Sequence, residues 1–208
     1  NKNHSGIIFS LKKYLTKFPK GPNFLKANYY LANILFKEKQ FDKAIVNYNI
    51  ILKAGITPFS EDTLAKLSQI YLEKQKFQDA LPLLERLEKE AYTIENIQFA
   101  QSNLMKGYYE TQAYIAAISY AKKVLSMSSV KNTLEQDAIT IIARSAFKTE
   151  DFVMAEEYYT ELEKNAIGAL KAETLYYNAF FKNQQKEYIA SNKVVQKLIA
   201  DYSTYKYW

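Results

Sequence analysis

One pattern recurs five times along the 208 residues, and this recurrence constrains the fold more than any other feature of the chain. In each copy an aromatic residue stands three positions before a small one: Phe41 and Ala44, Phe77 and Ala80, Tyr114 and Ala117, Phe152 and Ala155, Tyr188 and Ser191. The small residues follow one another at spacings of 36, 37, 38 and 36. A period of this length indicates tandem repeats, each of which is one supersecondary unit.

Each copy has the pattern of two helices joined by a short polar turn. In the second copy Leu64, Leu67 and Ile70 fall on one helical face. After the polar EKQK, a second apolar stripe runs from Phe77 to Leu87. Only five Gly and four Pro occur in the chain, which is typical of helices joined by short turns. The sequence therefore predicts an all-α protein built of helical hairpins, each with a first and a second helix.

The recurring small residues have a mechanical explanation. Two antiparallel helices approach closely only where a small side chain lies at their crossing, and we expect the aromatic three residues earlier to fill the space between them. One hairpin cannot bury both of its faces, so neighbouring hairpins stack into an α-solenoid. In the second copy we also expect Gly55 to end the preceding helix and Ser60 to cap the N-terminus of the next one.

This pattern resembles the tetratricopeptide repeat (TPR) family over essentially the whole chain. The matching residues are Leu31, Ala32, Phe41, Ala44 and Tyr48 in one repeat, Tyr108, Tyr114, Ala117 and Ala121 in another, and Phe152, Ala155 and Tyr159 in a third. The chain departs from the family in its period, which exceeds the usual length of about 34 residues, and in having the closing proline only at Pro19. The resemblance implies a right-handed superhelix of antiparallel helical hairpins.

The same alignment divides the chain into one array of repeats. The predicted boundaries are 1–21, 22–57, 58–93, 94–130, 131–167, 168–203 and 204–208. Segment 1–21 is predicted to be the second helix of a truncated repeat, with Ile7 and Leu11 at the small and large packing positions. Segment 204–208 is predicted to begin a further first helix. The chain is thus interpreted as an excerpt of a longer array, whose open apolar ends predict self-association.

The composition excludes several kinds of chemistry. The chain has no Cys and a single His, His4, so Ser–His and Cys–His catalytic arrangements and Cys-based zinc sites are absent. The five Gly are isolated and form no phosphate-binding loop. Six acidic residues within 150–163 are interpreted as the solvated outer face of a helix rather than a cation site. We therefore predict no enzymatic activity, no cofactor and no metal.

The charge is concentrated near the start of the chain. Residues 1–60 carry ten Lys against Glu38 and Asp42, a net charge of +8, whereas the whole chain carries +6. Only Arg86 and Arg144 are Arg, although bidentate recognition of phosphates and bases favours Arg over Lys. Nucleic acid is therefore not the expected partner. Since no apolar run approaches the ~20 residues that span a bilayer, no membrane insertion is predicted for this segment either.

The TPR resemblance implies that the first helices line a concave groove where partner segments bind. Alignment on the small residues places ten residues toward this groove: Tyr29, Asn33, Phe36, Gln69, Lys106, Tyr109, Arg144, Phe147, Tyr176 and Phe180. Aromatic rings provide rigid contact area, and Lys or Arg can meet acidic groups of a partner. For each single ring, packing between hairpins remains an equal alternative.

We predict a non-catalytic protein–protein interaction scaffold that binds a protein or peptide segment in this groove. One alternative is a repeat region that presents substrate within a larger envelope enzyme or complex. Another is an RNA-binding helical repeat, whose affinity would fall steeply with salt. The stretch LKKYLTKFP followed by ANYYLA resembles TPR modules of Gram-negative cell-envelope proteins, which implies a periplasmic or envelope location in a bacterium.

Overall fold

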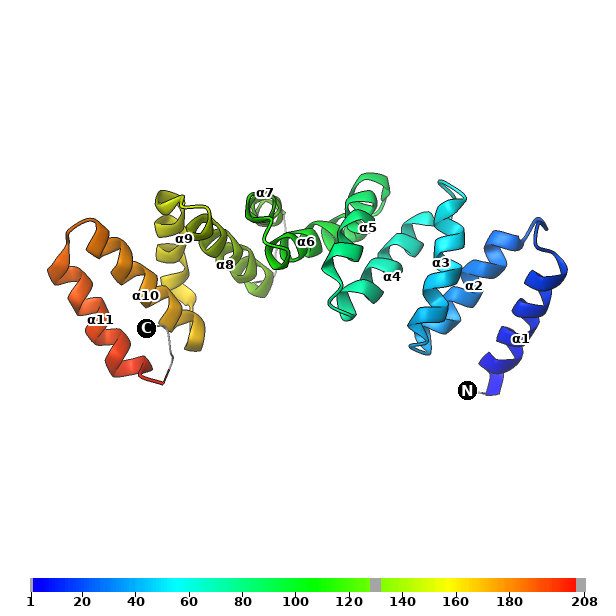
Figure 1. The fold of residues 1–208 in the computed structure, drawn as a ribbon, viewed down its shortest axis with the longest axis horizontal. Helices are drawn as coiled ribbons and strands as arrows, with labels where there is room; N and C mark the ends of the chain where they lie inside the picture. The colour runs from blue at the N-terminus through cyan, green and yellow to red at the C-terminus, as the bar shows by residue number, and fades with distance from the viewer. Residues whose placement is uncertain (1, 128–131, 205–208) are drawn as a thin grey trace. The chain divides into compact units, whose positions relative to one another are not determined.

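A computed structural model describes residues 2–127 and 132–204, which contain eleven α-helices and no strand (Figure 1). The helices are α1 (Lys2–Lys17), α2 (Phe24–Lys37), α3 (Phe41–Lys53), α4 (Ser60–Glu73), α5 (Phe77–Glu90), α6 (Ile94–Glu110), α7 (Tyr114–Leu125), α8 (Asn132–Lys148), α9 (Phe152–Asn165), α10 (Gly168–Gln184) and α11 (Tyr188–Tyr202). The predicted all-α class is confirmed. Of the predicted segment 204–208, residues 205–208 lie outside the described residues.

The helices pack mainly against their neighbours in the chain. Helix α2 pairs with α3, α4 with α5, α8 with α9, and α10 with α11, while α3 also meets α4 and α9 meets α10. Each second helix begins at one of the five recurring aromatics. Packing restricted to sequence neighbours is the arrangement of a solenoid, and this confirms the predicted stacking of hairpins.

Two compact units divide the chain, Asn1–Ala100 (unit 1) and Gln101–Trp208 (unit 2), and the division falls inside α6. The sequence predicts a single array. Within each unit the described helices follow the predicted order of first and second helices. The repeat boundaries remain a prediction.

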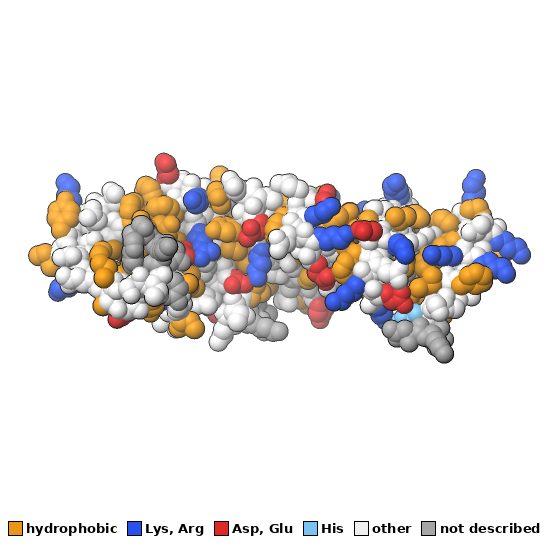
Figure 2. Space-filling view, turned by 60° about the horizontal axis from the view of Figure 1, so that its bottom comes forward, with side chains coloured by type: hydrophobic (Ala, Val, Ile, Leu, Met, Phe, Trp, Pro, Cys, Tyr) orange, Lys and Arg blue, Asp and Glu red, His pale blue; other side chains and the backbone are white. Residues whose placement is uncertain are grey.

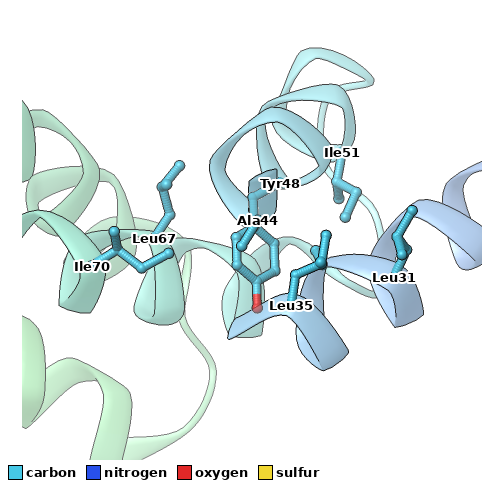
Figure 3. Close-up of a cluster of buried hydrophobic side chains, with 8 residues drawn as sticks. Leu31, Leu35, Ala44, Tyr48, Ile51, Leu67 and Ile70 are labelled. Atoms are coloured by element: carbon cyan, nitrogen blue, oxygen red, sulfur yellow. The ribbon is translucent and has the colours of Figure 1, made fainter. Parts of the chain in front are cut away.

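The five recurring small residues lie in the interior, and none is more than 6% exposed. In unit 1, Ala44 forms a stripe on α3 together with Tyr48 and Ile51, and all three are fully buried. Figure 3 shows this stripe pointing toward the leucines of α2 and toward Leu67 and Ile70 of α4. A second helix therefore covers both its own first helix and the first helix of the next hairpin, as a small side chain at the crossing allows.

The recurring aromatics fill the space between helices only in part. The Phe41 ring lies 5.9 Å from that of Phe36, within the predicted hairpin interior. Phe152 also lies between helices, with its ring 5.5 Å from that of Phe147 and 6.0 Å from that of Phe180, although it is 43% exposed. Tyr188 is 61% exposed and fills little of this space.

The turn inside each hairpin depends on a residue in the left-handed conformation. These residues are Lys39, Gln75, Gln112, Glu150 and Lys186, with φ between 55° and 63°. In the first hairpin the N–H of Lys39 donates to the Phe36 carbonyl at 2.9 Å and that of Gln40 to the Leu35 carbonyl at 2.8 Å. This is a Schellman motif, which normally carries glycine at the left-handed position. A side chain there costs about 1 kcal/mol of backbone strain.

The connection between α3 and α4 differs from the expectation in one detail. Gly55, with φ +88°, follows the end of α3 as predicted. Ser60, however, is the first residue of α4 and not its N-cap. Its hydroxyl accepts the Thr57 N–H at 2.8 Å and donates to the Gly55 carbonyl at 3.2 Å, because the preceding turn leaves both groups within reach.

Candidate functional site

The ten residues predicted to face a partner all lie on first helices, and the two units divide them. Unit 1 holds Tyr29, Asn33, Phe36 and Gln69, and unit 2 holds Lys106, Tyr109, Arg144, Phe147, Tyr176 and Phe180. Their role in binding stays a prediction. Their contacts within each unit decide what kind of surface they can offer.

In unit 1 a polar network joins α2, α3 and α4. The Tyr29 hydroxyl donates to Asp62 Oδ2 at 2.7 Å, and Lys66 Nζ bonds the same oxygen at 2.7 Å. Lys66 also donates to Asn33 Oδ1 at 2.9 Å, and the buried Tyr48 hydroxyl donates to that oxygen at 2.7 Å. The structure thus brings Tyr29 and Asn33 together through Asp62 and Lys66, which the sequence analysis did not single out.

The phenol of Tyr29 is fixed as a hydrogen-bond donor. Burial, together with the hydrogen bond to Asp62, raises the pKa of Tyr29 to about 12. Its ring also stacks on Phe59 with the ring centroids 4.7 Å apart. The Tyr29 side chain therefore holds α2 to α4 and presents only part of its surface to a partner.

The other two residues of unit 1 behave differently from each other. Phe36 is half-buried in the hairpin interior against Phe41. Gln69 is exposed, and its amide donates to Glu73 Oε1 at 3.1 Å, one turn further along α4. Neither joins the network around Tyr29 and Asn33.

In unit 2 the two predicted cations form ion pairs with the next first helix. Lys106 Nζ on α6 lies 2.6 Å from Asp137 Oδ2 on α8. The Arg144 guanidinium on α8 binds Glu173 on α10 through two bonds, Nε to Oε1 at 2.7 Å and Nη2 to Oε2 at 2.5 Å. Sequence reasoning assigned these cations to acidic groups of a partner. Within the structure their charges are instead balanced by carboxylates of the same chain.

The Arg144–Glu173 pair is the most enclosed polar feature of unit 2. Glu173 is buried, and its Oε1 also accepts the hydroxyl of the buried Tyr159 at 3.0 Å. Hydrogen bonds to Glu173 raise the pKa of Arg144 further above its usual range. Burial, and then the nearby carboxylate, raise the pKa of Tyr159. Arginine and tyrosine both keep their protons, and the pair joins α8, α9 and α10.

Aromatic residues of α8, α9 and α10 form one cluster around Phe147. Its ring lies 4.6 Å from Tyr177, 5.4 Å from Phe180, 5.5 Å from Phe152 and 6.2 Å from Phe181. Phe147 and Phe180 are half-buried, so for these rings the structure shows packing between hairpins.

The other two predicted rings of unit 2 each contact a tyrosine. Tyr176 contacts the cluster through Tyr177, with centroids 5.2 Å apart, and is 37% exposed. Tyr109 meets Tyr114 at 6.0 Å, edge to face, and is half-buried. Of the six predicted residues in unit 2, Tyr176 thus offers an exposed aromatic ring that packed neighbours hold in place.

A recurring acid explains why the cations are paired. Asp62, Asp137 and Glu173 each lie 15 residues before the aromatic that starts the second helix of their hairpin. Each accepts hydrogen bonds from the preceding first helix, from Tyr29, Lys106 and Arg144 respectively. A periodic acid at one register was visible in the sequence and could have predicted these pairs.

The acidic segment 150–163 takes part in local structure. Asp151 caps α9 by accepting the Met154 N–H at 3.1 Å, and Glu163 accepts the Asn178 amide at 2.7 Å. Glu157 and Glu161 are exposed, as the interpretation of a solvated face expects. Over residues 2–127 and 132–204, no group of three or more acidic or His side chains is arranged to hold a metal ion. Nor is any helix in these ranges long and apolar enough to cross a membrane.

Comparison with known proteins identifies the class of fold. No family model and no curated protein matches the chain. Among solved structures, the chain is similar to PilF of Pseudomonas aeruginosa, with a TM-score of 0.55 and 15% identity over 97% of this chain and 93% of that one. The chain is also similar to PilW, a type IV pilus biogenesis factor, with a TM-score of 0.54 and 14% identity over 99% of this chain and 96% of that one.

A tetratricopeptide repeat protein of Parabacteroides merdae is similar to the same degree. Its TM-score is 0.54 and its identity 16%, over 93% of this chain and 72% of that one. Identities this low show the fold alone. The chain has a TPR-like fold, which confirms the resemblance seen in its sequence.

Proposed function

We propose that this protein is a non-catalytic scaffold that binds a protein or peptide segment on the first helices of its units. The observation that carries the proposal is the exposed Tyr176 ring at the edge of an aromatic cluster in unit 2. Aromatic side chains held by packed neighbours lose little conformational entropy on binding and often dominate the energy of an interface. A partner would therefore gain contact area here at low cost.

The pairing of the cations narrows the chemistry of the proposed partner segment. Lys66, Lys106 and Arg144 are each bonded to carboxylates of the chain itself. Their charge is largely balanced, so acidic groups of a partner would gain little from them. We therefore propose that the segment recognised at Tyr176 is apolar or aromatic. The same balance of charge gives these three cations little attraction for RNA phosphates.

The proposal is tested with random 12-residue peptides displayed on phage and selected against the purified protein. We expect enriched peptides to carry aromatic and apolar residues and to bind in fluorescence anisotropy titrations. Tyr176→Ala should weaken binding at least tenfold, because it removes the exposed ring and leaves the rest of the cluster in place.

Tyr188→Ala is the matched control. Tyr188 is also an exposed tyrosine of unit 2, but it starts α11, a second helix. Peptides that bind Tyr176→Ala and Tyr188→Ala equally well would indicate a binding surface outside the first helices. A selection that enriches no peptide would contradict the proposal that the protein recognises peptide segments. Capture of nucleic acid with a steep salt dependence would favour the RNA alternative.

A further inference from the structure

A groove of about 420 Å³ lies between α1 and α3 in unit 1. Two leucines of α2, Leu31 and Leu35, both labelled in Figure 3, line this groove. Leu15 of α1 and Val46 of α3 add to its apolar lining, and Val46 is 61% exposed. The groove therefore offers apolar surface to a ligand between two helices and over a third.

The groove does not depend on what precedes residue 1. In α3 the buried stripe from Ala44 to Ile51 packs on first helices. The corresponding residues of α1 are Ile7, Leu11 and Tyr14, and a first helix before α1 would pack on them. None of these three residues lines the groove. The groove is thus a feature of α1, α2 and α3 themselves.

Asn47 leaves the groove open. It stands six residues after Phe41, the aromatic that starts its helix. The same position in the other second helices carries a half-buried apolar or aromatic side chain: Leu83, Tyr120, Tyr158 and Val194. Leu83, for example, packs on the core cluster of α2, α3 and α4. The Asn47 amide instead donates to the Lys43 carbonyl of its own helix at 2.8 Å. A polar side chain therefore replaces the one that fills this place in the other hairpins.

Two lysines flank the apolar lining, Lys12 on α1 and Lys43 on α3, and both are exposed. Within the part of the chain that the structure describes, neither is in an ion pair, and Lys43 donates to the uncharged Gln40 Oε1 at 2.9 Å. By contrast, the neighbouring Asp42 is paired with Lys74. Figure 2 shows lysine side chains next to apolar ones at the right of the view, where α1 and α2 lie. The groove thus combines an apolar lining with two unbalanced positive charges.

We propose that the α1–α3 groove binds an acidic segment of a partner protein. An apolar side chain of this segment packs on Leu31 and Leu35, and carboxylates beside it meet Lys12 and Lys43. The net charge of +8 over residues 1–60 attracts such a segment. A nucleic acid would use the lysines alone and leave the apolar lining uncovered. The groove is separate from the first-helix surface around Tyr176, and the proposal does not rest on that surface.

A second copy of the chain is the less favourable occupant. Its acidic segment 150–163 does hold an apolar side chain, Val153, that is 82% exposed. Most carboxylates of this segment are bonded within unit 2, however: Asp151, Glu156, Glu161 and Glu163. These carboxylates would have to give up their partners to meet the lysines of the groove. The proposal therefore commits to a segment of another protein.

The test uses random 12-residue peptides displayed on yeast and selected against Tyr176→Ala, so that the surface at Tyr176 does not contribute. We expect enriched peptides to combine Asp or Glu with a large apolar residue. In fluorescence anisotropy titrations, the double variant Lys12→Glu, Lys43→Glu should bind these peptides at least tenfold more weakly. The matched control is Lys13→Glu, Lys53→Glu, which changes exposed lysines of the same two helices outside the groove. It should weaken binding less than threefold.

Asn47→Leu tests the apolar lining. It introduces the side chain that Leu83 has at the same position, so it should fill the groove, weaken the peptides at least tenfold and leave Tm unchanged or higher. A selection that enriches no acidic peptide, or equal binding by the two lysine variants, would overturn the proposal. Unchanged binding by Asn47→Leu would also overturn it. So would sedimentation equilibrium that shows a dimer of the wild type dispersed by Asn47→Leu, since the groove would then serve a second copy.

Discussion

The Arg144–Glu173 ion pair gives the sharpest test of how unit 2 is held together. The Glu173 side chain is only 7% exposed, whereas that of Arg144 is 37% exposed. Removing one partner of a buried pair costs about 3–5 kcal/mol, and exposed pairs contribute about 0–1 kcal/mol. Because one partner is buried and the other partly exposed, the cost of Arg144→Met should lie between these limits. We expect this variant to lower the free energy of unfolding by about 2–3 kcal/mol, because Glu173 loses both bonds to the guanidinium and keeps the one from the Tyr159 hydroxyl.

Removing both charges together should restore most of the lost stability. In the triple variant Arg144→Met, Glu173→Met, Tyr159→Phe, apolar side chains of similar volume replace both ions, and the buried hydroxyl that Glu173 accepted is absent. We expect its stability to lie within about 1 kcal/mol of the wild type. Lys106→Met is the matched control. Its pair with Asp137 is 46% and 48% exposed, so its loss should stay below about 0.5 kcal/mol.

Hydrogen exchange measured by mass spectrometry is the suitable assay. Repeat proteins do not always unfold in one step, and exchange reports the opening free energy of α8, α9 and α10 separately from unit 1. A loss below about 0.5 kcal/mol in Arg144→Met would show that the pair is dispensable. A triple variant as unstable as the single one would refute the explanation that an unpaired buried charge causes the loss.

Three further predictions concern single sites in the two units. Burial would raise the pKa of Glu61, but hydrogen bonds from Thr93 and Asn96 outweigh burial and lower this pKa. The ionised Glu61 carboxylate therefore stabilises the fold above the unfolded-state pKa, and this stabilisation is lost as pH falls through the folded-state pKa. Urea midpoints should therefore show Glu61→Gln less stable by about 1 kcal/mol at pH 7, with a deficit that shrinks as pH falls below the ordinary glutamate pKa of 4.5; a deficit that stays constant would contradict this. Gln112→Gly should raise Tm by relieving a left-handed conformation, with a gain of about 0.5–1 kcal/mol, and a lower Tm would refute the strain. Ala117→Leu should cost about 2–3 kcal/mol in urea denaturation, because Ala117 is fully buried; a neutral result would exclude a tight helix crossing.

The sequence predicted the helical hairpins well because five copies repeat the same two constraints. An aromatic starts each second helix, and a small residue three positions later lies at the helix crossing. The hairpin turns were predicted only as short and polar. Their left-handed residues carry Lys, Gln or Glu, where a search for Gly finds no signal. Their conformation follows from the Schellman hydrogen bonds, which the packing of both helices imposes.

The candidate site was harder to predict because its polar contacts join different helices. Helical periodicity places Lys106 and Arg144 on the same face of their respective first helices. It does not show which residues of the next first helix lie opposite them. Their partners, Asp137 and Glu173, follow 31 and 29 residues later. The spacing of neighbouring helices decides whether such residues meet. Only the recurrence of acids at one register carries that information in the sequence.

The pairing of Lys106 and Arg144 on the first helices of unit 2 has a measurable consequence for the proposed surface at Tyr176. Because both cations are paired within the chain, binding at Tyr176 should depend on apolar contact and change little with salt. Titrations of the phage-selected peptides at 50 mM and 500 mM NaCl test this expectation. An affinity that falls steeply over this range would show that charge contributes to binding, and it would contradict the proposal that the recognised segment is apolar or aromatic.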